Sequence, residues 1–391
     1  MTDRPTVPEA EEDKPLITPL GSNKDPSRIE VASQWRLIWG RLVRNKVALV
    51  AGAIVLFFYL VAAFAEFLAP TDPTEAQPRF TYAPPQAIHL FVETEDGGSE
   101  FLPHVLGYQM SVDPDSLRRS FQPDPEQIIP IGFFVKGEPY EMWGLFPMDI
   151  HFIGPITPGE QFNLLGTDRL GRDLLSRLTY GARVSMSIGL IGVFSSLIIG
   201  IILGALSGYF GGWVDLAVQR LIEIVSAMPT IPLWLGFAAA IPLTWSPLTV
   251  YFVITLIVAL LAWTGLAREV RGRFLSLRNE DFVTAAKLDG SSTPRVIFRH
   301  ILPSLTSHIL AVVTLAIPTM IVAETALSFL GIGLKPPVVS WGVLLQDAQN
   351  IRTIASSPWL LIWPSGAVVV VVLAFNFLGD GLRDAADPYS T

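Results

Sequence analysis

Long apolar stretches without charged residues recur along the chain and set its organisation. They lie at residues 47–65, 184–214, 224–267, 301–323 (interrupted before Gly331 only by Glu324) and 353–378. About 20 helical residues cross a hydrocarbon core about 30 Å thick. The 44 residues of the third stretch are therefore enough for two crossings, with a turn near Pro242 and Pro247. Because backbone groups in lipid must be satisfied internally, the pattern predicts six transmembrane helices.

Basic residues near the ends of these stretches predict the orientation. Five Lys and Arg lie within residues 28–46, and seven lie between Arg268 and Arg299. The segment between the fifth and sixth helices carries only Lys335 and Arg352. Cytoplasmic segments are enriched in Lys and Arg, so we expect the N-terminus, the 267–306 loop and the C-terminus to be cytoplasmic.

The N-terminal region divides into a tail and a helix. Residues 1–27 are polar, contain several prolines and lack an apolar signal-peptide core, which predicts a disordered cytoplasmic tail. Within residues 28–46, apolar positions at helical spacing alternate with Arg and Lys. This pattern is typical of an amphipathic helix at a membrane surface, and it leads into the first transmembrane helix, so that residues 28–69 form one unit.

Residues 70–160 differ from the rest of the chain. They hold 14 of the 31 prolines and a net charge of -10, so the rest of the chain sums to +2. AIHLFVET and IIPIGFFVKGEPYEMWG read as strands, the second as a pair joined around residues 136–139. We expect a small β-rich extracytoplasmic insert between helices 1 and 2, followed by a membrane core over 161–391.

Composition narrows the classes of function. The chain is 50% hydrophobic and only 16% charged, with a mean hydropathy of +0.46, which argues against an ordinary soluble enzyme. It has no cysteine, five scattered histidines, no phosphate-binding G-x-x-x-x-G-K-[ST] loop and no G-x-S-x-G elbow. We therefore predict no catalytic residues, no metal site and no cofactor bound by this chain itself.

The segment 166–185, GTDRLGRDLLSRLTYGARVS, precedes the second crossing, which is expected near 185–207. Thr167 or Asp168 could cap a helix in which Leu170, Leu174 and Leu178 share one face. The favoured interpretation is an interfacial helix that anchors the second transmembrane helix. A direct substrate role for its charges is the alternative.

The 267–306 loop predicts two short helices. Acidic residues at 280–281 precede an apolar run, and Gly290 follows it, as expected at the two ends of a helix. Ala285 and Ala286 keep this helix slim, so that another protein could approach its backbone. Thr293 and Pro294 would begin a second helix that runs to Pro303.

Two acidic residues fall at membrane depth, namely Glu223 at the start of the third helix and Glu324 late in the fifth. A charged side chain within the membrane is costly, so we expect both residues to face the interior of the bundle and to be paired with other polar groups. We favour structural pairing or pore gating over substrate binding, and both over proton coupling.

Several motifs together resemble a known family. TAAKLDG, with Pro303 placed 13 residues after Gly290, is similar to the EAA loop of ABC-importer permeases. The order and spacing of further motifs resemble the C-type permease subunit of dipeptide/oligopeptide importers over roughly 28–70 and 160–388. These motifs are LGTDRLGRDLLSRLTYGARVS, GYFGGWVD, FRHILPS, AETALSFLGIGLKPP, SWG and LAFNFLGDGLRDAADP.

The resemblance implies an all-α polytopic type I permease fold with six transmembrane helices in the bacterial inner membrane. It implies a transport subunit that forms half of a peptide pathway and is not itself an enzyme. The expected partners are a second homologous permease, two cytoplasmic ATPases that bind ATP and Mg, a periplasmic substrate-binding protein and membrane lipid, with no nucleic acid. The implied ATPase-coupling residues are Phe282, Thr284, Ala285, Ala286, Leu288, Asp289, Gly290 and Pro303.

The sequence departs from the family at two places, and alternatives stay open. Thr284 stands where the EAA loop usually has Glu, so one contact to the ATPase is either missing or moved to Glu280 or Asp281. The 70–160 insert is longer than usual and is similar in placement to that of the branch that imports larger peptides. Oligosaccharides or opines are alternative substrates; an ion-coupled secondary transporter and a membrane enzyme are more distant alternatives.

Overall fold

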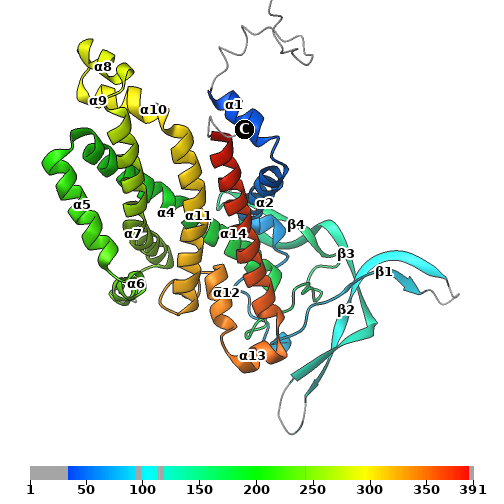
Figure 1. Ribbon diagram of the computed structural model, residues 1–391. Coiled ribbons are helices and arrows are strands. Elements are labelled where there is room, and N and C mark those ends of the chain that lie inside the picture. The colour runs from blue at the N-terminus through cyan, green and yellow to red at the C-terminus, as the bar shows by residue number, and fades with distance from the viewer. Residues whose placement is uncertain (1–33, 94–97, 113, 115–118, 243, 387–391) are drawn as a thin grey trace, which may run out of the picture.

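The computed structural model describes residues 34–93, 98–112, 114, 119–242 and 244–386. It combines a bundle of long helices with a twisted β-sheet that projects from the bundle (Figure 1). The tail over residues 1–27 and the first residues of the expected amphipathic helix lie outside the described residues.

The helical bundle is formed by five long apolar helices and one bent pair. The long helices are α2 Lys46–Ala63, α4 Leu174–Phe210, α7 Pro247–Leu277, α11 Thr306–Phe329 and α14 Trp359–Ala386. The pair α5 Gly212–Ala227 and α6 Thr230–Ala239 is bent by 83° and makes a sixth crossing if it counts as one span. The bend falls at Met228 and Pro229, because a proline lacks the N–H that would continue the helix.

The turn before α7 lies where proline spacing predicts it. Ser246 caps the helix, since its hydroxyl accepts a hydrogen bond from the Thr249 N–H at 3.2 Å. Pro247 then occupies the first helical position, where its missing N–H carries no cost.

The expected interfacial helix before the second crossing does not form as a separate element, because its residues from Leu174 onward are the first turns of α4. Asp173 caps α4 by accepting a hydrogen bond from the Ser176 N–H at 2.7 Å, and the helix continues unbroken for 37 residues. Residues 166–173 are irregular, because Gly171 has φ +76°, outside the helical region. Asp168, expected as a possible cap, instead bonds the Arg172 side chain at 2.7 Å.

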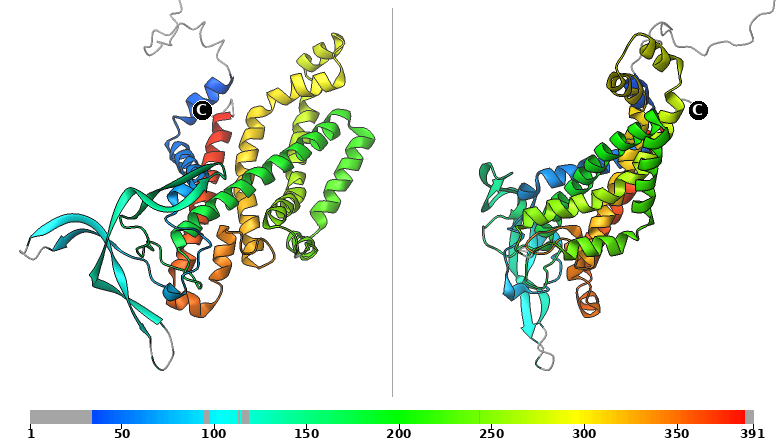
Figure 2. Two further views of the ribbon diagram at one scale, coloured as in Figure 1. Left: turned by 180° about the vertical axis from the view of Figure 1, so that it is seen from behind. Right: turned by 90° about the vertical axis from the view of Figure 1, so that its left-hand side faces the viewer.

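The insert contains a four-stranded antiparallel sheet in the order β1-β2-β3-β4. Its strands are β1 Ile88–Glu93, β2 Ser99–Val112, β3 Arg119–Met142 and β4 Phe146–Pro155. The predicted first strand corresponds to β1. Figure 2 shows the long β-ribbons extending away from the helices.

The predicted turn at residues 136–139 is wrong. These residues lie within β3, where the register with β4 shifts, and Met142 pairs with Phe146 across a turn at 143–145. Pro139 cannot donate to the strand ladder, so the chain bulges there without reversing. The reversal needs positive φ, which Trp143 and Gly144 supply at 55° and 69°.

The main core lies where α2, α4, α7, α11, α12 and α14 meet, around residues such as Met186, Ile321 and Trp341. The short helices at its periphery are α12 Trp341–Asp347 and α13 Ile351–Ser356. Small helices between α2 and the sheet are α3 Ala65–Leu68 and the 3-10 turn η2 Pro78–Phe80.

The amphipathic helix forms as α1, Gln34–Leu42, and packs on protein. Ile38 and Leu42 are buried with Ala385 at the end of α14. The 267–306 loop contains the short helices α8 Asp281–Leu288, α9 Thr293–Arg295 and α10 Leu302–Ser304. In Figure 1, α1 and the C-terminal end of α14 lie at the same end of the bundle as these three helices, opposite α12 and α13. The basic segments therefore share one end of the molecule.

Candidate coupling site and buried polar clusters

The first helix of the 267–306 loop is α8, Asp281–Leu288, and it ends in a complete Schellman motif. Gly290, at φ +76°, donates its N–H to the Lys287 carbonyl at 3.0 Å, and the Ser291 N–H bonds the Ala286 carbonyl at 3.1 Å. Both bonds satisfy carbonyls that would otherwise have no partner, and the left-handed position favours glycine. Asp289, which precedes this glycine, is the C-cap residue of α8.

Two faces of α8 differ sharply in exposure. Val283 and Ala286 are buried, whereas Phe282 is 42% exposed and Leu288 is 84% exposed. Ala285, which follows Phe282 by three residues, is also exposed and lies on the same side. The helix thus presents an apolar stripe that no other residue in the described part of the chain covers.

The predicted coupling residues divide into those whose side chains are exposed on this stripe and those that pack or cap α8 within this chain. Ala286 was expected to face a partner but is packed inside this chain. Thr284 and Asp289 are both exposed at the surface of α8 and its C-terminal end. Glu280 and Asp281, the two acidic residues considered as substitutes for the missing Glu, are also exposed at the start of α8.

The buried face of α8 rests on a small core of its own. Val283 and Ala286 pack with Phe274 of α7 and with Val296 and Ile301 of the following segment. This core is separate from the main one and also includes Ala205 of α4. The helix α8, residues 296–301 and the end of α7 therefore form a local unit that packs on α4.

Polar contacts fix this unit to α4 and α5. Arg278, just after α7, donates to the Gly208 carbonyl of α4 at 3.3 Å. Arg271 of α7 bonds both carboxylate oxygens of Asp215 in α5, at 2.5 and 2.6 Å. Bidentate Arg–carboxylate pairs constrain orientation as well as distance, so the end of α7 is held in a defined position.

The second helical part of the loop is irregular. It consists of α9 Thr293–Arg295, a π-helical turn Val296–Ile301 and α10 Leu302–Ser304. Pro294 lies at the start of α9 as expected, but Ser292 occupies the cap position expected for Thr293. Pro303 is exposed at the start of α10, just before α11 begins.

Glu324 of α11 is fully buried within a group of serines. Its Oε1 accepts hydrogen bonds from Ser328 and Ser340, both at 2.8 Å, and its Oε2 accepts one from Ser185 at 3.3 Å. Ser185 lies on α4, and Ser340 caps α12, so one carboxylate joins three helices. This geometry favours structural pairing, with hydroxyl groups as the partners.

Glu223 has a different position. It lies on α5 and pairs with Arg220 at 2.6 Å in an exposed ion pair, with 60% of its side chain exposed. The expectation that Glu223 begins the third span is wrong, because α5 starts at Gly212.

A buried charge network that sequence reasoning missed joins the start of α4 to α12. Asp168 bonds Arg172 and Arg177, and Arg177 also bonds Asp347 of α12 at 3.1 Å. Arg169 lies 3.4 Å from the other oxygen of Asp347. The charges expected either to sit at an interface or to meet a substrate thus neutralise one another. We call Asp168, Arg172, Arg177 and Asp347 the charge clamp.

A second ion pair lies at the end of α2. Arg183 of α4 bonds both oxygens of Glu66 in α3 and also donates to the Ala62 carbonyl at 2.8 Å. Burial raises the pKa of Glu66, but the bonds from Arg183 outweigh that effect and hold its pKa below the usual range. The pair fixes the end of α2 against α4.

Comparison with known proteins identifies the family. The family described as "Binding-protein-dependent transport system inner membrane component" matches residues 200–389, and the "N-terminal TM domain of oligopeptide transport permease C" matches residues 33–85. The dipeptide transport system permease protein DppC of Alkalihalophilus pseudofirmus is 31% identical over 376 residues, which cover 96% of this chain and 97% of that protein.

The chain belongs to the C-type permeases of binding-protein-dependent ABC importers.

A second relative agrees with this assignment. The oligopeptide transport system permease protein OppC of Haemophilus influenzae is 42% identical over 229 residues, which cover 59% of this chain and 71% of that protein. Among solved structures, the MetNI methionine ABC transporter in an inward-facing conformation matches with a TM-score of 0.42 and 17% identity. The match covers 53% of this chain and 95% of that one.

Family membership makes this chain a multi-pass permease subunit of the inner membrane and not an enzyme. Within the residues that the structure describes, no group of three or more His, Cys, Asp or Glu could hold a metal ion. His89 and His104 stack with ring centroids 5.4 Å apart, and His308 Nε2 lies 3.0 Å from a carboxylate oxygen of Glu269.

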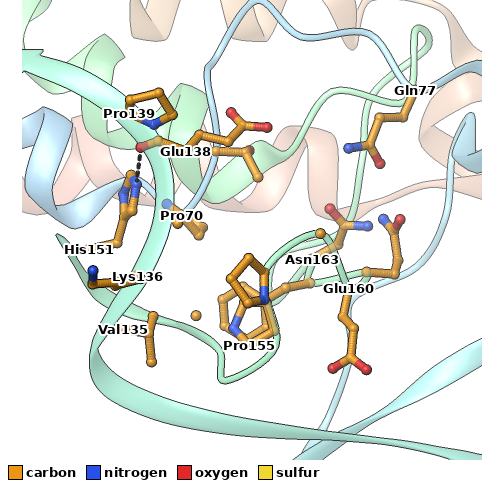
Figure 3. Close-up of a pocket in the computed structure, with 17 residues that line it drawn as sticks. Pro70, Gln77, Val135, Lys136, Glu138, Pro139, His151, Pro155, Glu160 and Asn163 are labelled. Atoms are coloured by element: carbon orange, nitrogen blue, oxygen red, sulfur yellow. Dashed lines mark hydrogen bonds between the residues drawn. The ribbon is translucent and has the colours of Figure 1, made fainter. Parts of the chain in front are cut away.

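A cavity of about 320 Å³ lies where the permease's sheet meets the chain that leaves α3 (Figure 3). Its lining includes Pro70, Val135, Glu138, His151 and Asn163. The two ring nitrogens of buried His151 face the carbonyl oxygens of Ala69 at 2.5 Å and Glu138 at 2.9 Å. His151 therefore ties β4 to β3 and to the end of α3.

Proposed function

We propose that this permease imports peptides together with a second, homologous permease that completes the pathway. The relatives named above are dipeptide and oligopeptide transport permeases, which supports peptides as the substrate class. In this proposal a periplasmic binding protein delivers the substrate. Two ATPases in the cytoplasm bind ATP and Mg and supply the energy.

The observation that carries the coupling role is the exposed stripe of α8. Phe282, Ala285 and Leu288 project from a helix that is capped at its C-terminal end and held by its own core. Such an element presents a fixed apolar ridge of the kind that fits a groove on another protein. In the proposal this stripe docks into one of the two ATPases, and the acidic residues Glu280 and Asp281 make the contact that Thr284 does not.

The orientation follows from charge. The end of the bundle with α8 carries Arg268 to Arg299, which supports a cytoplasmic location for this end and for both termini. The sheet and α12 then lie outside. The insert's net charge of -10 would favour a basic face on the binding protein, although an acidic surface also promotes solubility.

Co-purification of a tagged permease with its partner subunits tests the coupling role. Leu288→Asp should co-purify with less ATPase while retaining the second permease, because it places a charge on the stripe. Leu170→Asp is the matched control, since Leu170 is also exposed (43%) but lies before α4 at the opposite end. Full retention of the ATPases by Leu288→Asp and by Phe282→Asp would contradict the proposal.

Reconstituted transport tests the substrate class. Proteoliposomes that contain the complete transporter and its binding protein should accumulate a radiolabelled oligopeptide in an ATP-dependent manner. Accumulation of an oligosaccharide or an opine in place of the peptide would keep the permease role and overturn the peptide assignment.

A further inference from the structure

The β3–β4 hairpin exposes a large set of apolar side chains. We call it the hairpin patch, and its residues are Phe133, Phe134, Trp143, Leu145, Phe146, Met148, Ile150 and Phe152. At the tip, Leu145 is 72% exposed, and Phe134, which precedes the bulge in β3, is 66% exposed. Contiguous exposed apolar surface of this kind usually marks an interaction site.

The pattern along β4 shows that this exposure is one-sided. Phe146, Met148, Ile150 and Phe152 alternate with Pro147, Asp149 and His151, so the four apolar residues share one face of the strand. Antiparallel sheets normally place such a face on a core. Here all four side chains are more than a third exposed, and His151 on the other face is buried.

The hairpin patch lies against the end of a membrane-crossing helix. The Trp143 indole N–H donates to the carbonyl of Ala63, the last residue of α2, at 2.6 Å. The Trp143 ring lies 5.9 Å from Phe64, the residue that caps α2. The hairpin tip is therefore fixed at the depth where α2 leaves the hydrocarbon.

Aromatic contacts extend this connection along the strand. The ring centroid of Phe67 in α3 lies 5.9 Å from the ring centroids of both Phe134 and Phe152. The lipid-facing side of α2, with Leu56, Phe57 and Leu60 exposed, continues through Phe64 into the hairpin patch. The patch is thus an extension of a surface that lipid already covers.

We propose that the β3–β4 hairpin is a membrane anchor whose patch lies in the boundary between lipid head groups and acyl chains, beside α2. Trp is enriched at this depth in membrane proteins, and Trp, Phe and Leu form the apolar face of segments that lie in the interface. The occupant is a phospholipid surface, and the anchor fixes how the insert stands on the bilayer. The proposal depends on the membrane-crossing role of α2 and not on the transported substrate.

The absence of native cysteine makes a direct test possible. Single variants Phe146→Cys and Leu145→Cys are labelled with a nitroxide in the complete transporter, within nanodiscs of phosphatidylethanolamine and phosphatidylglycerol. Electron paramagnetic resonance then measures collisions with oxygen, which concentrates in lipid, and with a water-soluble nickel chelate. Asp149→Cys, on the other face of β4, is the matched control, and Phe57→Cys in α2 is the lipid reference.

We expect the oxygen-to-nickel ratio at 145 and 146 to be several-fold above that at 149 and to approach the ratio at 57. Equal ratios at 146 and 149 would place the patch in water and overturn the proposal. Low access to both reagents at 145 and 146 would mean that a protein subunit covers the patch, which would overturn it as well. Size-exclusion profiles that match the unmodified complex confirm that the variants fold.

Discussion

The two ends of the helical bundle differ in what they bury and what they expose. At the end with α8, backbone caps and a small apolar core hold a helix that leaves Leu288 84% exposed. At the end with α12, Asp168 and Arg177 are almost completely buried, and Glu324 is enclosed by serine hydroxyls. One end presents apolar surface outward, and the other encloses charge within this chain.

This contrast separates residues that act through a partner from residues that act through the fold. Removing one member of a buried ion pair leaves the other charge without compensation, which is costly whatever else is present. Removing an exposed apolar side chain costs little until another protein covers it. Stability and partner affinity should therefore respond to different ends of the molecule.

The largest expected effect is at the charge clamp. Arg177→Met removes one of the two arginines that contact both Asp168 and Asp347, so the buried carboxylates lose part of their compensation. The variant should lower the free energy of unfolding by about 3–5 kcal/mol. Thermal unfolding of the purified permease in detergent measures this loss. The double variant Asp168→Leu/Arg177→Met should recover part of it.

The exposed pair Arg220 and Glu223 supplies the matched control for the clamp. Its side chains are 68% and 60% exposed, and such pairs contribute about 0–1 kcal/mol. Arg220→Met should therefore change the melting temperature very little. Similar losses in Arg220→Met and Arg177→Met would remove the distinction between the two ends.

The serine cluster should give the next largest effect. Glu324→Leu removes the acceptor of three hydroxyl donors and should cost about 2–3 kcal/mol, because buried donors then lack partners. Glu324→Gln keeps an acceptor and should cost about 1 kcal/mol. Equal losses for the two variants in thermal unfolding would show that side-chain volume, and not the acceptor, matters.

At the other end, Leu288→Ala should weaken ATPase binding about tenfold, or about 1–2 kcal/mol, without changing the melting temperature. Val283→Ala, on the buried face of the same helix, should do the reverse and lower stability. A titration of the ATPase against the permease complex and a melting curve together measure both quantities. A melting temperature that falls as much for Leu288→Ala as for Val283→Ala would contradict an outward-facing stripe.

The smallest expected effect is at the end of α8. Gly290→Ala meets no atom within 4 Å but retains a φ of +76°, so it should destabilise the local cap by about 1 kcal/mol. Amide hydrogen exchange in α8 should then be about fivefold faster. Gly272→Ala, in α7 with open space and helical backbone, should instead leave exchange unchanged or slower.

Sequence alone predicts what lipid and local chemistry demand. A membrane-crossing helix needs about 20 apolar residues wherever it occurs, so five of the crossings could be located from hydropathy. Gly290 could be assigned to a helix end, because few other residues adopt its backbone conformation. The bend at Pro229 was missed, since apolar residues continue on both sides of it.

Contacts between distant residues could not be predicted. Asp168 and Asp347 are 179 positions apart, and nothing in either segment indicates that Arg177 lies between them. Before a helix, Asp168 is equally suited to cap it or to bind an arginine, and only the folded chain selects the second. Gly137 to Pro139 has the composition of a turn, yet β3 continues past it as a bulge.

The unbroken length of α7 has a mechanical consequence. This helix has 31 residues and is therefore about 45 Å long. Ser246 lies at one end, and the segment that leads into α8 begins at the other. A rotation of about 10° around its midpoint would move the two ends about 4 Å in opposite directions. A displacement of α8 would therefore move the opposite end of α7 by about the same distance in the opposite direction.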